Sequence, residues 1–181
     1  MFEFIKKSDY EILKYINKHM KCKFLDKIMP IITGLGNGGL AWILIAIIML
    51  KRGKYKFGLA ILLAIATSAG IVEGVIKPIV RRSRPFFRES KEAELLIKKP
   101  IGYSFPSGHS ASSFAVATVC IFGGIPFAYL FFILAILISF SRMYLFVHYP
   151  TDVICGGIFG SIIGYIISSL YYIKKIYKIL I

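Results

Sequence analysis

The chain has 181 residues, 57% of them hydrophobic, and a mean hydropathy of +0.72. An average soluble domain is only about 45–50% apolar, so this composition excludes that class and predicts a single integral membrane domain over residues 1–181. The 23 Lys and Arg residues outnumber 9 Asp and Glu residues, for a net charge of +14, which suits a lipid bilayer or an anionic substrate. We expect no nucleic-acid partner, because a basic groove needs polar surface that most of this chain lacks.

Residues 1–27 are predicted to form an amphipathic helix in the membrane interface. Apolar side chains such as Ile12 and Phe24 alternate there with lysines, which is typical of a helix whose lysines contact anionic headgroups. A helix packed against the rest of the protein is an equally open alternative for this pattern.

Five apolar segments follow, each near the roughly 20 residues that cross a bilayer. They are residues 28–50, 57–76, 107–123, 127–144 and 153–173. The glycines within 33–39 predict a break in the first segment, because each glycine costs a helix about 1 kcal/mol. The predicted fold is therefore an all-α polytopic membrane helix bundle of about five to six spans, with residues 28–181 as the transmembrane core.

Residues 81–106 are too charged to cross the bilayer and are predicted to form an active-site loop outside it. Counting spans places this loop, His109 and residues 142–152 on one face of the membrane. Residues 51–56 and the C-terminus fall on the opposite face, and the positive-inside rule favours the cytoplasm for them. The long loop is basic as well, however, so charge alone leaves the orientation open.

Three cations, Lys77, Arg84 and Arg142, lie at predicted span ends on the face of the long loop. Such a cluster needs an anion, and phosphate suits it because guanidinium groups bind its oxygens in pairs while lysine adds a point charge. Glu73 stands one helical turn before Lys77, and a carboxylate at that depth is expected to pair with a cation. Headgroup contact is the alternative for cations at span ends, and it is the preferred interpretation for Arg81, Arg82 and Arg88.

The sequence Pro106-Ser107-Gly108-His109 is predicted to open a helix, with proline in its first turn. Free backbone amides at Ser107 and Gly108, together with the positive end of the helix dipole, would favour an anion. His109 would project from this turn toward the same anion. A simple helix cap explains the proline and the serine but gives the histidine no partner.

A second histidine, His148, stands shortly before Pro150 and Asp152, where another helix is predicted to begin. Asp152 can complement the dipole of that helix. It can also accept a hydrogen bond from one ring nitrogen of His148, which leaves the other nitrogen free to attack phosphorus. Two histidines and several cations fit phosphoryl transfer, in which positioning and charge stabilisation supply most of the catalysis.

The three runs together resemble the type 2 phosphatidic acid phosphatase superfamily, whose membrane members hydrolyse lipid phosphates and diphosphates. Its first motif, Lys-x6-Arg-Pro, is matched by Lys77, Arg84 and Pro85. Its second, Pro-Ser-Gly-His, is matched by residues 106–109, and its third, Ser-Arg-x5-His-x3-Asp, by Ser141, Arg142, His148 and Asp152. All three motifs match in order and without substitution.

This resemblance implies a metal-independent mechanism that proceeds through a phosphohistidine. It makes His148 the nucleophile, Asp152 its orienting partner and His109 the acid that protonates the leaving oxygen. The residues implied to hold the phosphate are Lys77, Arg84, Ser107, Gly108 and Arg142. No cofactor is implied, and no carboxylate cluster or histidine pair stands at metal-ligand spacing.

The implied substrate is a membrane lipid whose tail stays in the bilayer while its headgroup reaches the cations. The short chain is most similar to bacterial enzymes that convert undecaprenyl diphosphate to undecaprenyl phosphate, and this resemblance implies an active site on the extracytoplasmic face of the plasma membrane. Phosphatidylglycerophosphate or phosphatidic acid phosphatase is the alternative. From another class, a non-catalytic lipid-phosphate binding or transport protein would need only the cations, so His148, Asp152 and His109 argue against it. The oligomeric state is left open.

Overall fold

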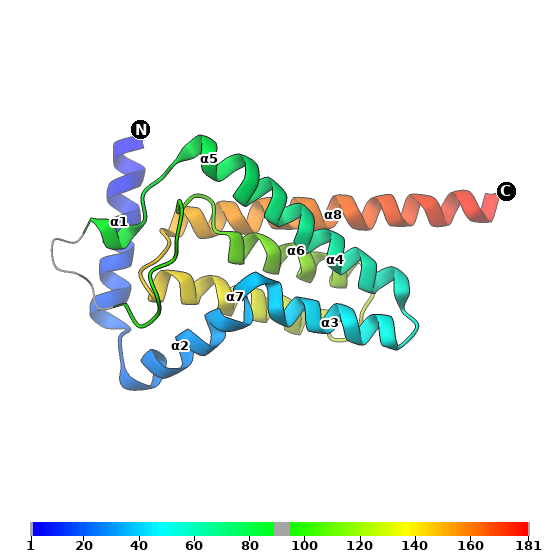
Figure 1. The fold of residues 1–181 in the computed structure, drawn as a ribbon, viewed down its shortest axis with the longest axis horizontal. Helices are drawn as coiled ribbons and strands as arrows, with labels where there is room; N and C mark the ends of the chain where they lie inside the picture. Colours follow the sequence, from blue (N-terminus) through cyan, green and yellow to red (C-terminus); the bar gives the residue numbers. More distant parts are fainter. Residues whose placement is uncertain (1, 89–94, 181) are drawn as a thin grey trace.

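The computed structural model describes the backbone of residues 2–88 and 95–180 and the side chains of residues 7–88 and 95–170 (Figure 1). All regular structure in these ranges is helical, which confirms the all-α prediction. The α-helices are α1 (Phe2–His19), α2 (Lys23–Leu35), α3 (Leu40–Lys51), α4 (Tyr55–Ala69), α5 (Lys77–Val80), α6 (Gly108–Phe122), α7 (Ala128–Tyr144) and α8 (Pro150–Leu180). A π-helix, η2 (Gly70–Ile76), joins α4 to α5, and short 3-10 turns occur at η1 (Asn37–Gly39) and η3 (Pro85–Phe87).

The five predicted apolar segments are all helical, but their lengths differ. Within the described residues, Tyr55–Phe87 and Pro150–Leu170 are long and apolar enough to cross a bilayer, and α2 with residues 37–51 forms a third candidate bent by 51°. The remaining two, α6 and α7, have 15 and 17 residues. A helix of that length covers only about 22–26 Å of a hydrocarbon core about 30 Å thick. The part of the chain that the structure describes thus has two to three helices of full spanning length.

The bend in the first span confirms the predicted glycine break. Gly38 and Gly39 have φ values of 56° and 74°, in the left-handed region that only glycine adopts without strain. The helix therefore ends at Leu35 and restarts at Leu40 in a new direction. This break brings Asn37, which stays exposed, beside the start of α6.

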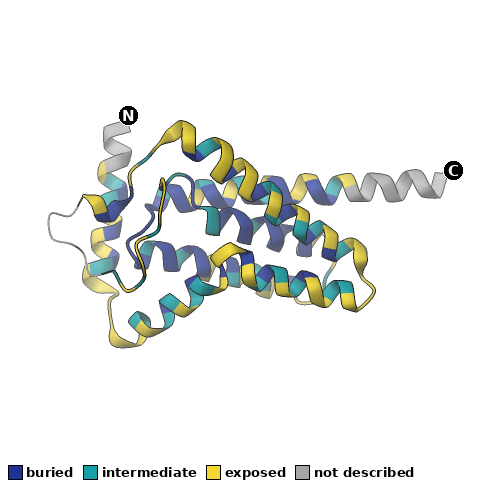
Figure 2. Ribbon diagram, in the orientation of Figure 1, coloured by how far each residue is buried: buried dark blue, intermediate teal, exposed yellow. Residues whose placement is uncertain are grey.

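Helix α6 forms the centre of the bundle and packs along α8, α7 and α4. Figure 2 shows it buried over most of its length. Its contact with α8 depends on glycines spaced four residues apart, because a Cβ at Gly156, Gly160 or Gly164 would collide with the α6 backbone. The close approach brings the N-terminal ends of α6 and α8 side by side.

The N-terminal helix is shorter than predicted. The sequence indicated one interfacial helix over residues 1–27, whereas α1 ends at His19 and α2 begins at Lys23. The chain turns here because Cys22 is extended and its backbone N–H bonds the Tyr144 hydroxyl at 3.3 Å instead of a helical carbonyl. Helix α1 also packs on α7 and α8, which is compatible with both a packed and an interfacial helix.

We expect Gly160→Ala to destabilise the protein, because its Cβ would overlap the carbonyl group of Ala111 in the α6 backbone. Overpacking of this kind costs about 1–3 kcal/mol, and thermal unfolding in detergent would show it as a lower midpoint. Gly70→Ala is the matched control, since Gly70 has helical dihedrals and its Cβ would meet nothing within 4 Å. Equal midpoints for the two variants would contradict the proposed packing.

Candidate active site

One end of the bundle gathers the motif residues from four parts of the chain. Helices α6 and α8 begin there, and α5 and α7 end there. Between α7 and α8, the backbone folds back so that the amides of Val147 and His148 both donate to the carbonyl of Arg142, at 3.1 and 3.2 Å. This turn, which Phe146 makes possible with a φ of 59°, presents His148 toward the arginines.

His148 is almost completely buried, with 1% of its surface exposed, and its Nε2 lies 3.1 Å from Nη1 of Arg84. A guanidinium group has only donors, so Nε2 must accept and carries no hydrogen. The hydrogen of the neutral ring is then on Nδ1, which lies 3.6 Å from Oδ2 of Asp152 and has no hydrogen-bond partner among the described residues. The predicted pairing is thus present as a close approach beyond hydrogen-bond length.

The surroundings of His148 keep its ring neutral. Its pKa lies well below the ordinary value, first because the ring is buried and then because the charges of Arg142, Arg84 and Lys77 disfavour a further proton. Burial and nearby positive charge both oppose the imidazolium form. The ring therefore keeps an unprotonated Nε2 at neutral pH, directed at a cluster of three cations.

Arg84 is held in place by backbone carbonyl groups. Its Nε donates to the carbonyl of Gly102 at 3.0 Å, its Nη1 to that of Val147 at 3.1 Å and its Nη2 to that of Ile101 at 3.2 Å. Two of these carbonyls belong to the long loop that follows η3, so the loop orients the guanidinium beside His148.

Lys77 pairs with Glu73 as predicted, with 2.6 Å between Nζ and Oε1. The lysine is buried and the glutamate is about half exposed, so the pair opens toward solvent on one side. The same Glu73 oxygen lies where a Cβ of residue 108 would be. Gly108 therefore permits the carboxylate to reach the start of α6.

The start of α6 differs from the prediction in two respects. The helix begins at Gly108 with Ser107 as its N-cap, so Pro106 precedes the helix and is not in its first turn. The amide of Ser107 is not free, because it donates to the carbonyl of Asp152 at 2.9 Å. The reason is the close packing of α8 on α6, which places a carbonyl where an anion was expected.

The Ser107 side chain remains suited to bind an anion. Its Oγ accepts from the hydroxyl of Ser110 at 3.1 Å, and that of Ser110 accepts from Ser139 at 3.0 Å. In this series of hydroxyl contacts, the Ser107 oxygen acts as an acceptor. The contacts therefore do not use the hydrogen of the Ser107 hydroxyl. This hydroxyl can donate that hydrogen to a phosphate oxygen.

The broken first span supplies two polar partners that the motifs did not indicate. His109 Nε2 lies 2.8 Å from Oδ1 of Asn37, and Nη1 of Arg142 donates to the hydroxyl of Thr33 at 2.6 Å. The glycine break was the only sequence signal for them, because it marks where the helix changes direction. Arg82 was likewise misassigned to headgroup contact, since its Nη1 donates to Oδ1 of Asp152 at 2.6 Å.

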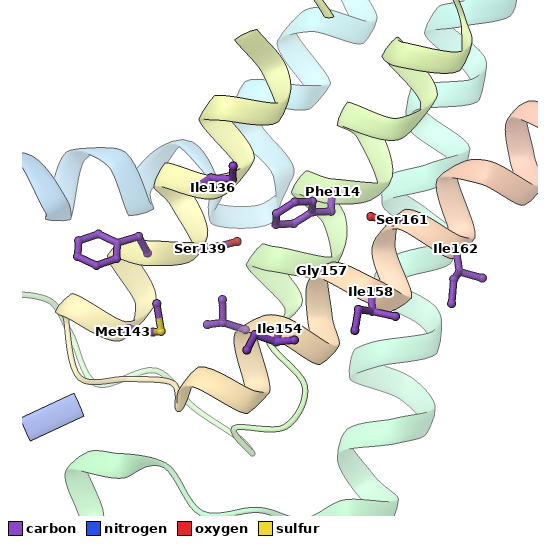
Figure 3. Close-up of a pocket in the computed structure, with 11 residues that line it drawn as sticks. Phe114, Ile136, Ser139, Met143, Ile154, Gly157, Ile158, Ser161 and Ile162 are labelled. Atoms are coloured by element: carbon purple, nitrogen blue, oxygen red, sulfur yellow. The ribbon is translucent and has the colours of Figure 1, made fainter. Parts of the chain in front are cut away.

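An apolar groove of about 510 Å³ lies on α6, α7 and α8 (Figure 3). Its walls include Phe114 on α6, Met143 on α7 and Ile154 on α8. Its hydrocarbon lining suits a lipid chain and not a phosphate group. The polar chemistry is concentrated in the buried cluster around His148, and no group of three or more His, Cys, Asp or Glu side chains in the described ranges is arranged to hold a metal ion.

Comparison with known proteins places this arrangement in a family. Residues 57–176 match the sequence model of the PAP2 superfamily. The lipid A 4'-phosphatase of Bacteroides thetaiotaomicron is 30% identical over 176 residues, covering 92% of this chain and 78% of that protein. The undecaprenyl-diphosphatase of Sulfolobus acidocaldarius is 30% identical over 175 residues, covering 94% of this chain and 83% of that protein.

A solved structure supports the same assignment. The crystal structure of a transmembrane PAP2-type phosphatidylglycerolphosphate phosphatase from Bacillus subtilis has a TM-score of 0.77 and 27% identity, over 93% of this chain and 86% of that one. These relatives are named as phosphatases, which argues against a non-catalytic binding protein. The chain therefore belongs to the PAP2 superfamily, and it is an integral membrane lipid phosphatase, a phosphoric ester hydrolase.

Proposed function

We propose that this phosphatase works without a metal, through a phosphohistidine on His148. The observation that carries the proposal is the contact between Nη1 of Arg84 and Nε2 of His148. It keeps the lone pair on the ring nitrogen that faces the cations, which is the tautomer that a nucleophile needs. Arg84 has to give up this contact when phosphate binds, and its donors then turn to the phosphate oxygens.

In the first step, Nε2 of His148 forms a bond to phosphorus while the bond from phosphorus to the leaving oxygen breaks. His109 gives its proton to that oxygen, so the lipid leaves as a neutral alcohol or as a protonated phosphate. The phosphohistidine gains positive charge on its ring, and the Asp152 carboxylate at 3.6 Å stabilises the Nδ1 hydrogen. In the second step, water loses a proton to His109 and attacks phosphorus, and the nitrogen–phosphorus bond breaks.

The three buried cations, Lys77, Arg84 and Arg142, hold the phosphate through both steps. Preorganised positive charge in a site shielded from water stabilises the transition state more than the same charge would in solvent. The Ser107 hydroxyl donates one hydrogen bond, and Gly108 lets the phosphate approach the backbone at the start of α6 once the Glu73 carboxylate, which lies beside Gly108 here, moves aside. Asn37 accepts from His109 and orients its ring.

The proposed substrate is undecaprenyl diphosphate, which the enzyme converts to undecaprenyl phosphate at the extracytoplasmic face of the plasma membrane. The name of the relative from Sulfolobus acidocaldarius, which aligns with 94% of the chain, supports this choice. Phosphatidylglycerophosphate, phosphatidic acid and a lipid A phosphate are the competing substrates, the last because of the relative from Bacteroides thetaiotaomicron.

We expect His148→Ala to reduce phosphate release by about 10³-fold or more, because it removes the attacking atom. Purified protein would be assayed in detergent with EDTA present, where the wild type is expected to retain its activity. His19→Ala is the matched control, since His19 is exposed on α1 and far along the chain from the motifs. Wild-type turnover by His148→Ala would remove the proposed nucleophile, and loss of wild-type activity in EDTA would contradict a metal-free site.

A panel of lipids distinguishes the candidate substrates. Undecaprenyl diphosphate is expected to give the highest kcat/KM when compared with phosphatidylglycerophosphate, phosphatidic acid and a lipid A phosphate in the same detergent. The measurement is phosphate release at several lipid concentrations. A higher kcat/KM on any of the other three lipids would replace the proposed substrate while leaving the mechanism intact.

A further inference from the structure

Helix α1 carries a carboxylate that the proposed chemistry does not use. Asp9 is only 2% exposed, and its Oδ1 accepts the backbone N–H of Thr151 at 3.0 Å, while its Oδ2 accepts the Thr151 hydroxyl. Its Oδ2 also lies 2.6 Å from Nη2 of Arg82. A carboxylate is rarely buried unless it is paired and hydrogen-bonded, and this one is fixed to the first turn of α8.

The Arg82 guanidinium lies between two buried carboxylates. One nitrogen, Nη2, binds Asp9, and the other, Nη1, binds Oδ1 of Asp152 and the Thr151 hydroxyl at 2.6 and 2.7 Å. Its central carbon is 4.0 Å from the centre of the Tyr149 ring. The planar fork of arginine is suited to two partners at once, so this side chain joins α1 to the two residues on either side of Pro150.

The two oxygens of Asp152 have separate partners. Oδ1 is bound by Arg82, while Oδ2 accepts the amide of Tyr149 at 2.9 Å and faces Nδ1 of His148 at 3.6 Å. The direction of Oδ2 therefore depends on how Arg82 binds Oδ1, together with the Tyr149 amide. The position of Arg82 depends in turn on Asp9.

The net charge of this cluster also supports a role for Asp9. Asp152 alone with Arg82 would be a neutral pair, with little negative charge left for His148. Asp9 adds a second carboxylate, so the three side chains carry a net charge of −1 beside a histidine that becomes positive when it is phosphorylated. At low local dielectric such a charge acts over several ångströms.

We propose that Asp9 and Arg82 are positioning residues, which hold Asp152 toward His148 and preserve its negative charge, so that α1 is part of the machinery of the active site. This inference rests on the roles proposed above for His148 and Asp152. Neither Asp9 nor Arg82 belongs to the matched motifs, and 73 residues separate them in the chain.

The test is Asp9→Asn in the full-length enzyme, assayed on the panel lipid that the wild type hydrolyses fastest. The variant keeps the shape of the side chain and removes its charge. We expect kcat to fall about 10- to 100-fold, the range that small misplacements of a catalytic group produce, with KM changed less than about twofold because Asp9 is not among the groups proposed to hold the phosphate. An unchanged kcat would overturn the proposal.

Two controls on α1 separate this effect from a general loosening of the helix. Glu11→Gln makes the same chemical change on an exposed side chain, and we expect wild-type kinetics. Leu13→Ala removes a fully buried apolar side chain from the same helix, and it is expected to lower the unfolding midpoint while leaving kcat within about threefold of wild type. A loss of kcat in Leu13→Ala as large as that in Asp9→Asn would overturn a specific role for the carboxylate.

A double variant with Asp9→Asn and Arg82→Gln tests whether Asp9 acts through Arg82. If Asp9 acts through Arg82, the double variant loses no more kcat than Arg82→Gln alone, whereas independent residues give losses that multiply. Should Asp9→Asn fail to fold, Arg82→Lys replaces it, because lysine keeps the charge but cannot bind both carboxylates as a fork. It is expected to lower kcat with KM unchanged, and a wild-type kcat would overturn the proposal.

The outcome for His148→Ala in the same assay separates this inference from the proposed function. Activity in His148→Ala would remove the nucleophile and the inference together. An inactive His148→Ala beside a fully active Asp9→Asn would overturn the inference alone.

Discussion

The burial of three cations beside one neutral histidine is the constraint on which the rest of the structure depends. Buried charges are costly unless they are paired and hydrogen-bonded, and each cation here has its own support: Glu73 for Lys77, loop carbonyls for Arg84 and the Thr33 hydroxyl for Arg142. Only one of these supports is an anion, so positive charge remains for a phosphate. The same charge helps to keep His148 neutral, as its proposed role as nucleophile requires.

The elements that carry these supports lie outside the sequence motifs. The glycine break between α2 and α3 brings Thr33 and Asn37 to Arg142 and His109, and α1 brings Asp9 to Arg82. The N-terminal part of the chain therefore does more than meet the membrane. It supplies hydrogen-bond partners to side chains of the site, of which Arg142 and Asp9 are buried and would be costly to leave unpaired.

The tight contact between α6 and α8 determines the geometry at the centre of the site. Glycines on α8 let the two backbones approach, and the two helix starts meet where the Ser107 amide donates to the Asp152 carbonyl. Residues from the second and third motifs are thereby held in one rigid unit. The apolar groove lined by residues of α6, α7 and α8 lies on the same helices, and its lining suits a lipid chain.

Sequence alone determined the helical class, the glycine break, the Glu73–Lys77 pair and the residues of the three motifs, because each depends on local spacing or on composition. Only the tertiary structure decided that α1 ends at His19, that the Ser107 amide is occupied, and that Thr33, Asn37, Asp9 and Arg82 support the site. These features join residues far apart in the chain, such as Asp9 and Arg82, whose spacing carries no periodic signal. A buried polar group needs a partner, but packing alone selects which residue provides it.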